Sequence, residues 1–200
     1  MIVIIDYGMG NLRSVQKAFE AINAEAKITN TVEDILKADK VVLPGVGAMG
    51  PAFQKLQELA LTGPIRKVVA DGKPFLGICL GLQLLFEKSS EGGYAEGLRI
   101  LEGTVERFDH TQKVPHMGWN QINIKTAGQK MFQGLSSGDN VYFCHSYFVK
   151  PKDESVAACT TNYGIDYVAA VVKGNVWGCQ FHPEKSQKVG LAILRNFADL

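Results

Sequence analysis

The segment Phe75-Leu76-Gly77-Ile78-Cys79-Leu80-Gly81 carries the strongest structural signal in this chain. Its apolar first half is typical of a buried strand, and the residues that follow predict a helix from Leu80 to about Lys88. A cysteine between two glycines at such a junction has the form of a nucleophile elbow, in which a strained turn exposes a reactive side chain. The start of the helix favours a thiolate there, because its free N–H groups and dipole attract negative charge. The segment alone fits equally well a buried structural cysteine between glycines that allow close packing.

Strand-like and helix-like segments alternate around this junction in the first half of the chain. Helices are predicted near 12–22, 51–60 and 64–71, the first of them capped by Asn11. Strands separated by helices on this rhythm require βαβ crossovers, which place parallel strands in one sheet with helices over both faces. The predicted strands are Ile2–Ile5, 27–29, 41–43 and 74–78.

The second half of the chain has a different pattern, in which short extended segments are separated by Gly, Asn and Asp turns. Lys173-Gly174-Asn175, for example, predicts a hairpin, and a last helix is predicted over about 187–197. We therefore expect an α/β fold: an open, mostly parallel twisted sheet with helices on both faces and an added antiparallel strand region, in a single domain over residues 1–200. The segments predicted to be extended are 100–108, 119–124, 141–149, 156–161, 167–172 and 176–181.

The composition is that of an ordinary globular protein: of 200 residues, 46% are hydrophobic and 20% are charged. The formal net charge is +1 and no polybasic block is present, which argues against nucleic acid as the main partner. No apolar run approaches the ~20 residues that cross a bilayer, and the N-terminus lacks the basic region of a signal peptide. We therefore expect a cytoplasmic protein with no membrane partner. The four cysteines form no CxxC pair, so reduced thiols are expected.

Phe181-His182-Pro183-Glu184 supplies the groups that a cysteine nucleophile needs. A histidine at the end of the predicted strand 176–181 can take the thiol proton and later deliver it to a leaving group. The carboxylate of Glu184 can hold the other imidazole nitrogen and so fix its tautomer. Taken alone, the motif is better explained by a loop-capping histidine beside a solvated acid. Together with the elbow at Cys79, it predicts a Cys79–His182–Glu184 triad.

Pro44-Gly45-Val46-Gly47 closes the third predicted strand. The glycines on either side of Val46 allow its peptide bonds to reorient and to point an N–H at developing negative charge. The N–H groups near Val46 and Gly47, with that of Leu80, would form an oxyanion hole. Without the elbow, the same residues describe a plain turn between a strand and a helix.

Three further motifs carry weaker signals. Gly8-Met9-Gly10 follows a strand, but Arg13 stands where a dinucleotide loop needs its third glycine, so no nucleotide cofactor is expected. Cys179 and His182 have the spacing of metal ligands, but Cys179 lies in a predicted strand and is expected to face the core, so no metal site is predicted. The segment 114–120 is predicted to be a loop whose aromatic, Met and amide side chains are typical of an interface or of a core.

With these residues in place, the chain resembles the class I glutamine amidotransferases, whose catalytic cysteine, histidine and glutamate occur in this order. The segment Gly77-Ile78-Cys79-Leu80-Gly81-Leu82-Gln83 is close to the family pattern GxCxGxQ, and 181–184 supplies the rest. The match covers essentially all 200 residues and departs from the pattern at no catalytic position. The resemblance implies hydrolysis of glutamine to glutamate and ammonia, without a cofactor or a metal. The residues that it implies for glutamine binding are Gly47, Gln83, Ser146, Tyr147 and the backbone around Pro183.

Two segments, 115–120 and 142–147, resemble members of the family that pass ammonia to a separate cyclase subunit in histidine biosynthesis. That cyclase makes imidazole glycerol phosphate and an aminoimidazole carboxamide ribotide. It has a (β/α)₈ barrel fold, which takes ~250 residues, so the resemblance implies a heterodimer of two chains. We further expect the strand end at 44–47 to turn its N–H away until the partner is loaded. The implied contact residues are Met117, Trp119, Asn120, Tyr142 and Lys185.

Other functions remain open from the sequence. Glutaminase subunits that serve anthranilate, guanylate or pyridoxal phosphate synthesis are the nearest alternatives, because only 115–120 and 142–147 argue against them. A free-standing cysteine amidase or γ-glutamyl hydrolase would keep the triad and need no partner. A non-catalytic binding module would normally lack at least one member of the triad, and here all three are present.

Overall fold

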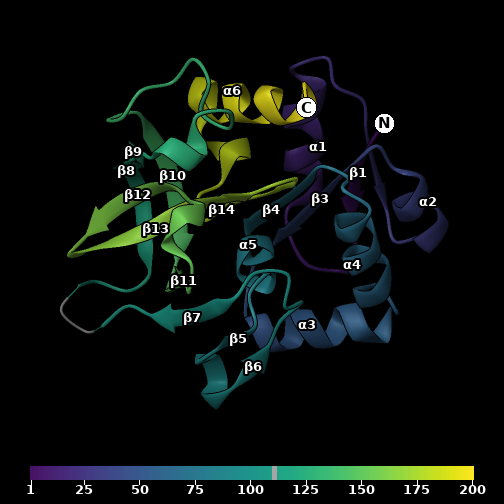
Figure 1. The fold of residues 1–200 in the computed structure, drawn as a ribbon, viewed down its shortest axis with the longest axis horizontal. Coiled ribbons are helices and arrows are strands. Elements are labelled where there is room, and N and C mark those ends of the chain that lie inside the picture. The colour runs from purple at the N-terminus through teal and green to yellow at the C-terminus, as the bar shows by residue number, and fades with distance from the viewer. Residues whose placement is uncertain (110–111) are drawn as a thin grey trace.

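A computed structural model describes residues 1–109 and 112–200 of the chain. Within these residues, five parallel strands form one side of the main sheet, in the spatial order β2 (Ala26–Thr29), β1 (Ile2–Ile5), β3 (Lys40–Gly45), β4 (Phe75–Cys79) and β14 (Val176–Cys179), with β2 at the edge (Figure 1). Gly45 pairs with Cys79, and Cys179 pairs with Ile78. Because parallel strands end at the same edge of a sheet, the loops that follow β3, β4 and β14 meet there.

Helices cover both faces of this sheet, as predicted. In β1, Ile2 and Ile4 belong to one hydrophobic cluster and Val3 and Ile5 to the other, and all four are buried. A strand that is buried on both sides reads as a continuous apolar run, which explains the N-terminal sequence. One face carries α1 (Leu12–Glu20) and α6 (Gln187–Ala198), and the other carries α2 (Val32–Lys37), α3 (Met49–Glu58), α4 (Thr62–Ala70) and α5 (Leu80–Leu84) (Figure 1).

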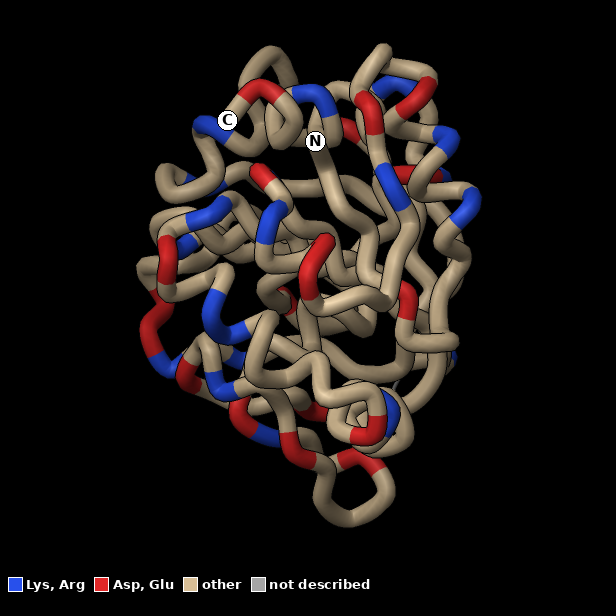
Figure 2. Tube along the Cα trace, turned by 90° about the vertical axis from the view of Figure 1, so that its right-hand side faces the viewer, with Lys and Arg blue, Asp and Glu red and all other residues tan. Residues whose placement is uncertain are grey.

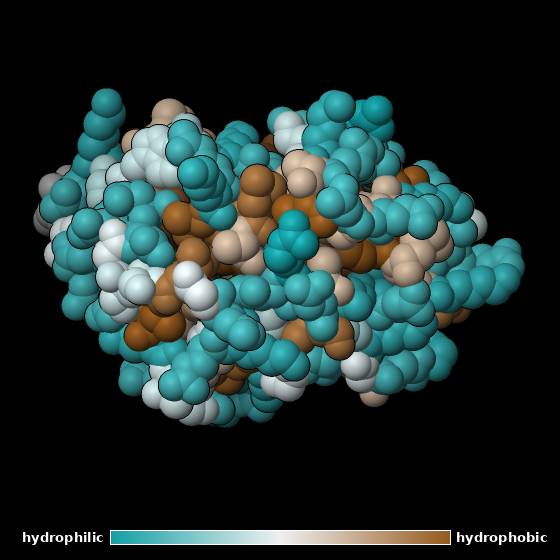
Figure 3. Space-filling view, turned by 90° about the horizontal axis from the view of Figure 1, so that it is seen from above, coloured by the Kyte–Doolittle hydropathy of each residue, from teal (hydrophilic) through white to brown (hydrophobic). Residues whose placement is uncertain are grey.

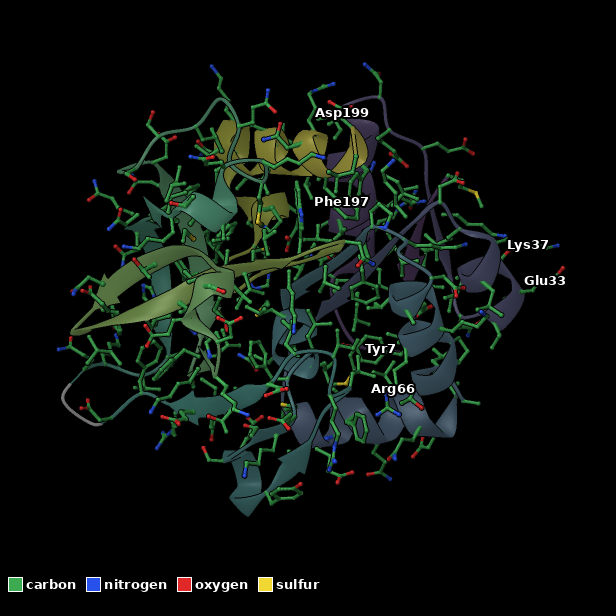
Figure 4. The ribbon with its side chains drawn as sticks, in the orientation of Figure 1. Tyr7, Glu33, Lys37, Arg66, Phe197 and Asp199 are labelled. Atoms are coloured by element: carbon green, nitrogen blue, oxygen red, sulfur yellow. The ribbon has the colours of Figure 1, made fainter. Side chains whose placement is uncertain are left out.

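Phe197 anchors α6 to the sheet and to α1 (Figure 4). Its ring centroid lies 6.5 Å from that of Phe19 in α1 and 5.9 Å from that of Trp177 in β14. Burying an aromatic ring of this kind stabilises the fold by about 2–3 kcal/mol. Since α6 follows His182 after one short 3₁₀ turn, η4 (Pro183–Lys185), its packing also fixes the loop that carries the predicted catalytic histidine.

The rest of the main sheet comes mostly from the second half of the chain, and its strands pair antiparallel, as predicted, except for one parallel pair among the described residues. Gly174, at a φ of +58°, and Asn175 form the two-residue turn of a hairpin, in which Lys173 pairs with Val176. The added strands are β5 (Lys88–Ser89), β6 (Ala95–Glu96), β7 (Gly103–Arg107), β9 (Asn123–Ile124), β11 (Tyr147–Pro151), β12 (Ala157–Tyr163) and β13 (Ile165–Lys173). Three further 3₁₀ turns are η1 (Glu91–Gly93), η2 (Thr126–Gly128) and η3 (Glu154–Val156).

The loop prediction for 114–120 is wrong, because most of this segment is a strand. β8 (His116–Gln121) pairs antiparallel with β10 (Asn140–His145) in a small second sheet. Its side chains alternate, with His116 buried and Met117 exposed. The Pro and Gly in the segment hid the period of two, and the backbone hydrogen bonds of the strand come from pairing with residues 19 to 29 positions away.

Three other features of the secondary structure differ from the sequence prediction. The helix after Cys79 ends at Leu84 rather than near Lys88, because Lys88 enters β5 and pairs with Thr104. The expected continuous strand over 141–149 bends at Ser146, where the chain leaves the β8–β10 sheet for the main sheet. The short helix α2 was not predicted, since six residues are too few to establish helical periodicity.

The surface has mixed charge and polarity. Basic and acidic residues are interspersed along the trace without a broad region of one sign (Figure 2), and hydrophilic side chains cover most of the face seen from the side of α6, with apolar ones gathered across its middle (Figure 3). Among the described residues, no helix has the length and apolar character that crossing a membrane requires. The same residues contain no group of three or more His, Cys, Asp or Glu side chains arranged to hold a metal ion.

Candidate active site

Cys79 stands on a strained turn where β4 runs directly into α5. Its φ of +54° and ψ of −108° are unusual for a residue with a side chain, and such outliers concentrate at functional sites. The turn depends on glycine at the neighbouring positions. A Cβ on Gly81 would lie 1.7 Å from the carbonyl oxygen of Leu43, and one on Gly77 would lie 2.7 Å from that of Gly81. The strand-to-helix junction is therefore as predicted, although α5 is short.

His182 and Glu184 form a buried pair beside this turn. Their side chains are 4% and 2% exposed, and Nδ1 of His182 lies 2.8 Å from Oε1 of Glu184. Burial by itself lowers the pKa of His182, but hydrogen bonds to Cys79 and to Glu184 outweigh it and raise the pKa to about 10. A protonated imidazole between a sulfur and a carboxylate is the arrangement that activates a cysteine nucleophile.

The sulfur of Cys79 has two further polar neighbours. Nε2 of Gln180 lies 3.7 Å from Sγ, and the carbonyl oxygen of Cys144 lies 4.0 Å from it. Both come from strand ends at the same edge of the sheets, β14 and β10. These two neighbours lie 65 and 101 positions away from Cys79 in the sequence.

A cavity of about 230 Å³ opens over Cys79 and His182. It is lined by most of the residues predicted for the oxyanion hole and for glutamine binding, together with three that the sequence analysis missed, Glu91, Cys144 and His145. Pro183 is buried nearby but is not part of the lining. A larger cavity, of about 1080 Å³, lies over β11 and β13, and its lining contains neither a cysteine nor a histidine, so the smaller cavity is the candidate site. The predicted residues in the lining are Val46, Gly47, Leu80, Gln83, Ser146, Tyr147 and Lys185.

The residues predicted to contact a partner separate into two groups. Trp119 and Tyr142 are paired across β8 and β10 with ring centroids 6.0 Å apart, and Nζ of Lys185 lies 5.7 Å from the Tyr142 ring. Met117, 61% exposed, projects from the same face of β8, as expected from the period of two. Asn120 projects from the opposite face and donates a hydrogen bond to the carbonyl oxygen of Asn162.

The missed residues carried little signal in the sequence. Gln180 was detectable as a polar residue that alternates with Cys179 and Phe181, so its side chain points to the opposite face from theirs, where it is also fully buried. His145 follows the buried positions Val141 and Phe143 of β10, a pattern that predicts burial but no role. Glu91 reaches the cavity from a distant 3₁₀ turn, where its carboxylate accepts a hydrogen bond from the N–H of Met49.

This doubly covered sheet, with a cysteine elbow facing a buried His–Glu pair, defines a class I glutamine amidotransferase, and the family model described as "Glutamine amidotransferase class-I" matches residues 3–200. Solved structures agree on the fold. A chain described as "Crystal structure of glutamine amidotransferase" superposes with a TM-score of 0.79 at 22% identity, each chain covered in full. A chain of "Structure of PurLQS from Thermotoga maritima" superposes with a TM-score of 0.75 at 18% identity, over 99% of this chain and 97% of that one.

More similar relatives narrow the assignment. The "Imidazole glycerol phosphate synthase subunit HisH" of Syntrophotalea carbinolica is 54% identical, with both chains covered in full. The HisH subunit of Aquifex aeolicus is also 54% identical, over 98% of this chain and 94% of that one, and that of Geobacter metallireducens is 52% identical, over 98% and 97%. The chain therefore belongs to the HisH family of class I glutamine amidotransferases.

Proposed function

We propose that this chain hydrolyses glutamine to glutamate and ammonia and passes the ammonia to a (β/α)₈ cyclase, as the glutaminase subunit of imidazole glycerol phosphate synthase in histidine biosynthesis. The observation that carries this function is the meeting of Cys79 and His182 in one cavity, with Glu184 behind the imidazole. Residues 1–200 would act as a single glutaminase domain in the cytoplasm.

The first step is attack on glutamine. The thiolate of Cys79 adds to the carbon of the side-chain amide, and the C–O π electrons move to the oxygen. Backbone N–H groups donate hydrogen bonds to this oxyanion, from near Val46 and Gly47 and from Leu80. All three residues line the cavity beside the sulfur. Gln83, Ser146 and Tyr147 lie on the other parts of the lining, where they can hold the amino-acid end of the substrate.

His182 then moves the protons. Because its pKa is raised to about 10, the imidazole is protonated at neutral pH and can donate to the departing nitrogen as the C–N bond breaks. Ammonia leaves, and Cys79 holds the γ-glutamyl group as a thioester. The neutral imidazole next takes a proton from water, which attacks the thioester and releases glutamate. Glu184 keeps the imidazole in one orientation through both steps.

The partner receives the ammonia before bulk water can protonate it. The face formed by Met117, Trp119, Tyr142 and Lys185 supports this role, because it presents exposed apolar and aromatic groups next to the cavity that Lys185 also lines. Exposed aromatic groups of this type are enriched in the centres of interfaces. A turn of the peptide bonds at 44–47 on binding would limit the wasteful hydrolysis of glutamine by the free chain.

The test is glutamate release by the purified chain, with and without the cyclase and its ribonucleotide ligand. We expect release to be much faster in the loaded complex. Cys79→Ser should abolish glutamine-dependent synthesis while synthesis from added ammonia continues, and Cys159→Ala, at a buried cysteine remote from the cavity, should retain both. Equal rates for the free chain and the complex would contradict the partner's role, and glutamine-dependent synthesis by Cys79→Ser would contradict the mechanism.

A further inference from the structure

Gln180 is a fully buried amide directly behind the nucleophile. Its side chain is 0% exposed, and its Nε2 lies 3.7 Å from Sγ of Cys79. Gln180 does not line the cavity, so it is not placed to contact glutamine. A buried amide needs partners for its polar atoms, and one of the partners here is the reacting sulfur.

The direction of this contact is set by a backbone carbonyl. The carbonyl oxygen of Tyr147 can only accept hydrogen bonds, so the side-chain amide of Gln83, 3.0 Å away, must turn its Nε2 toward it. The same Nε2 then donates to Oε1 of Gln180 over 3.1 Å. With its oxygen engaged in this way, Gln180 can present only its N–H groups to the sulfur of Cys79.

A histidine holds the same carbonyl from the other side. Nδ1 of His145 lies 2.8 Å from the oxygen of Tyr147 and must donate to it. Burial lowers the pKa of His145 to about 3, so the imidazole is neutral at physiological pH and its Nε2 is free to accept. The hydroxyl of Tyr167 lies 3.2 Å from that Nε2. The carbonyl that orients the two amides is therefore itself held in place.

Apart from the protonated imidazole of His182, the features near the sulfur do less for a negative charge. The carbonyl oxygen of Cys144, at 4.0 Å, is an acceptor and disfavours a thiolate. The helix that begins at Leu80 has five residues, so its dipole is small. An N–H that donates to an ionised sulfur is stronger than a neutral hydrogen bond, because one partner carries a full charge.

We propose that Gln180 stabilises the thiolate of Cys79 by donating a hydrogen bond to Sγ, and that Tyr147 and Gln83 fix the direction of that donation. This role rests on the proposed function, in which the thiolate attacks glutamine. Gln180 thus acts as a positioning residue, which increases the fraction of nucleophile that is ready to react without contacting the substrate.

Two variants separate the hydrogen bond from packing and charge. Gln180→Glu keeps the acceptor for Gln83 and places an oxygen toward the sulfur, whereas Gln180→Met removes the donor without adding charge. Alkylation of Cys79 by iodoacetamide, followed against pH by mass spectrometry of its peptide in the full chain, needs no substrate. In both variants we expect the pH midpoint of alkylation to rise by about one unit. At a pH below the midpoint, this shift corresponds to a roughly tenfold smaller fraction of thiolate. In the complex with the cyclase, kcat should fall roughly tenfold. The KM for glutamine should change by less than about threefold, in either direction.

The controls keep the two proposals distinguishable. Gln57→Glu adds the same charge at an exposed position and should leave the alkylation profile unchanged. An unchanged midpoint in either folded Gln180 variant would overturn the role of Gln180. A shift in the glutamate variant alone would come from the added charge, and a shift in the methionine variant alone would come from altered packing. If Cys79→Ser instead retains glutaminase activity, the proposed function fails, whatever the alkylation profiles show.

Discussion

His182 and Glu184 are hydrogen-bonded through Nδ1 and Oε1 at 2.8 Å, and both side chains are almost completely buried. Only one residue, Pro183, stands between them in the chain, so η4 must curl the carboxylate back beneath the imidazole. The other oxygen of Glu184 has no hydrogen-bond partner within the described part of the chain. His182 is therefore the partner that compensates this carboxylate, because a buried charge needs an opposite charge or a hydrogen-bond donor close to it.

Glu184→Gln should lower kcat for glutamine hydrolysis by about 10²–10⁴, because an amide cannot fix the imidazole tautomer or stabilise its positive charge. KM should change little, since Glu184 does not line the cavity. Steady-state kinetics of the complex with the cyclase measure both constants. The matched control is Glu33→Gln, which breaks the exposed ion pair with Lys37 on α2 and should leave kcat unchanged (Figure 4). A kcat for Glu184→Gln within threefold of the unaltered chain would refute the role of the carboxylate.

Acid should destabilise the fold through His116 and His145. Burial lowers the pKa of these two side chains to about 4 and about 3, whereas both have ordinary values in the unfolded chain. The unfolded state therefore binds more protons below about pH 6.5, and stability falls as the pH falls from there toward 4. The pKa of His182 is raised instead, so its contribution is fully present below pH 6.5 and is lost only toward pH 10.

Urea unfolding at pH 7 and pH 5 measures this effect. His116 and His145 should each lower the free energy of unfolding by about 2 kcal/mol at pH 5 relative to pH 7. The variant His116→Gln should be less stable at pH 7 but should lose less on acidification than the unaltered chain. Equal losses in the two proteins would show that His116 does not titrate as its burial demands.

Tyr7→Phe should stabilise the protein. The hydroxyl of Tyr7 is buried and has no hydrogen-bond partner among the residues that the structure describes, and its burial raises its pKa far above the usual value (Figure 4). Removing an unpaired buried hydroxyl should raise the free energy of unfolding by about 1 kcal/mol. Chemical denaturation tests this value, with Tyr94→Phe at an exposed position as the neutral control. A loss of stability in Tyr7→Phe would indicate a partner for the hydroxyl.

Trp119→Ala should weaken the complex with the cyclase. Trp119 is 49% exposed, packs edge-on against Tyr142, and lies on the face that we assign to the partner. An aromatic residue at the centre of an interface contributes about 2 kcal/mol or more, so Kd should rise at least about thirtyfold. Calorimetric titration with the purified cyclase measures it. Tyr94→Ala removes a ring beside β6 that is at least as exposed, and it should leave Kd unchanged. Similar Kd values for both variants would place the interface elsewhere.

Local pattern was sufficient to predict much of the fold. The apolar run Ile2–Ile5, the capped helix that begins after Asn11 and the hairpin at Gly174 all follow from rules that act over a few residues. Errors occurred where a segment depends on distant pairing. The strand at 116–121 exists because it pairs with 140–145, although the proline just before it and the glycine within it argue against a strand.

The amino-acid sequence determined the chemistry of this protein: a cysteine that only glycine neighbours can place on a sharp turn, and a histidine joined to its carboxylate two residues later. Tertiary structure alone decided the surroundings of the sulfur. Gln180 reaches Cys79 because β4 and β14 are neighbours in the sheet, and the direction of its amide depends on a carbonyl from a third strand. The physical reason is that side-chain alternation fixes which residues share a face of a strand, whereas the partner across that face is fixed only when distant strands pair in register.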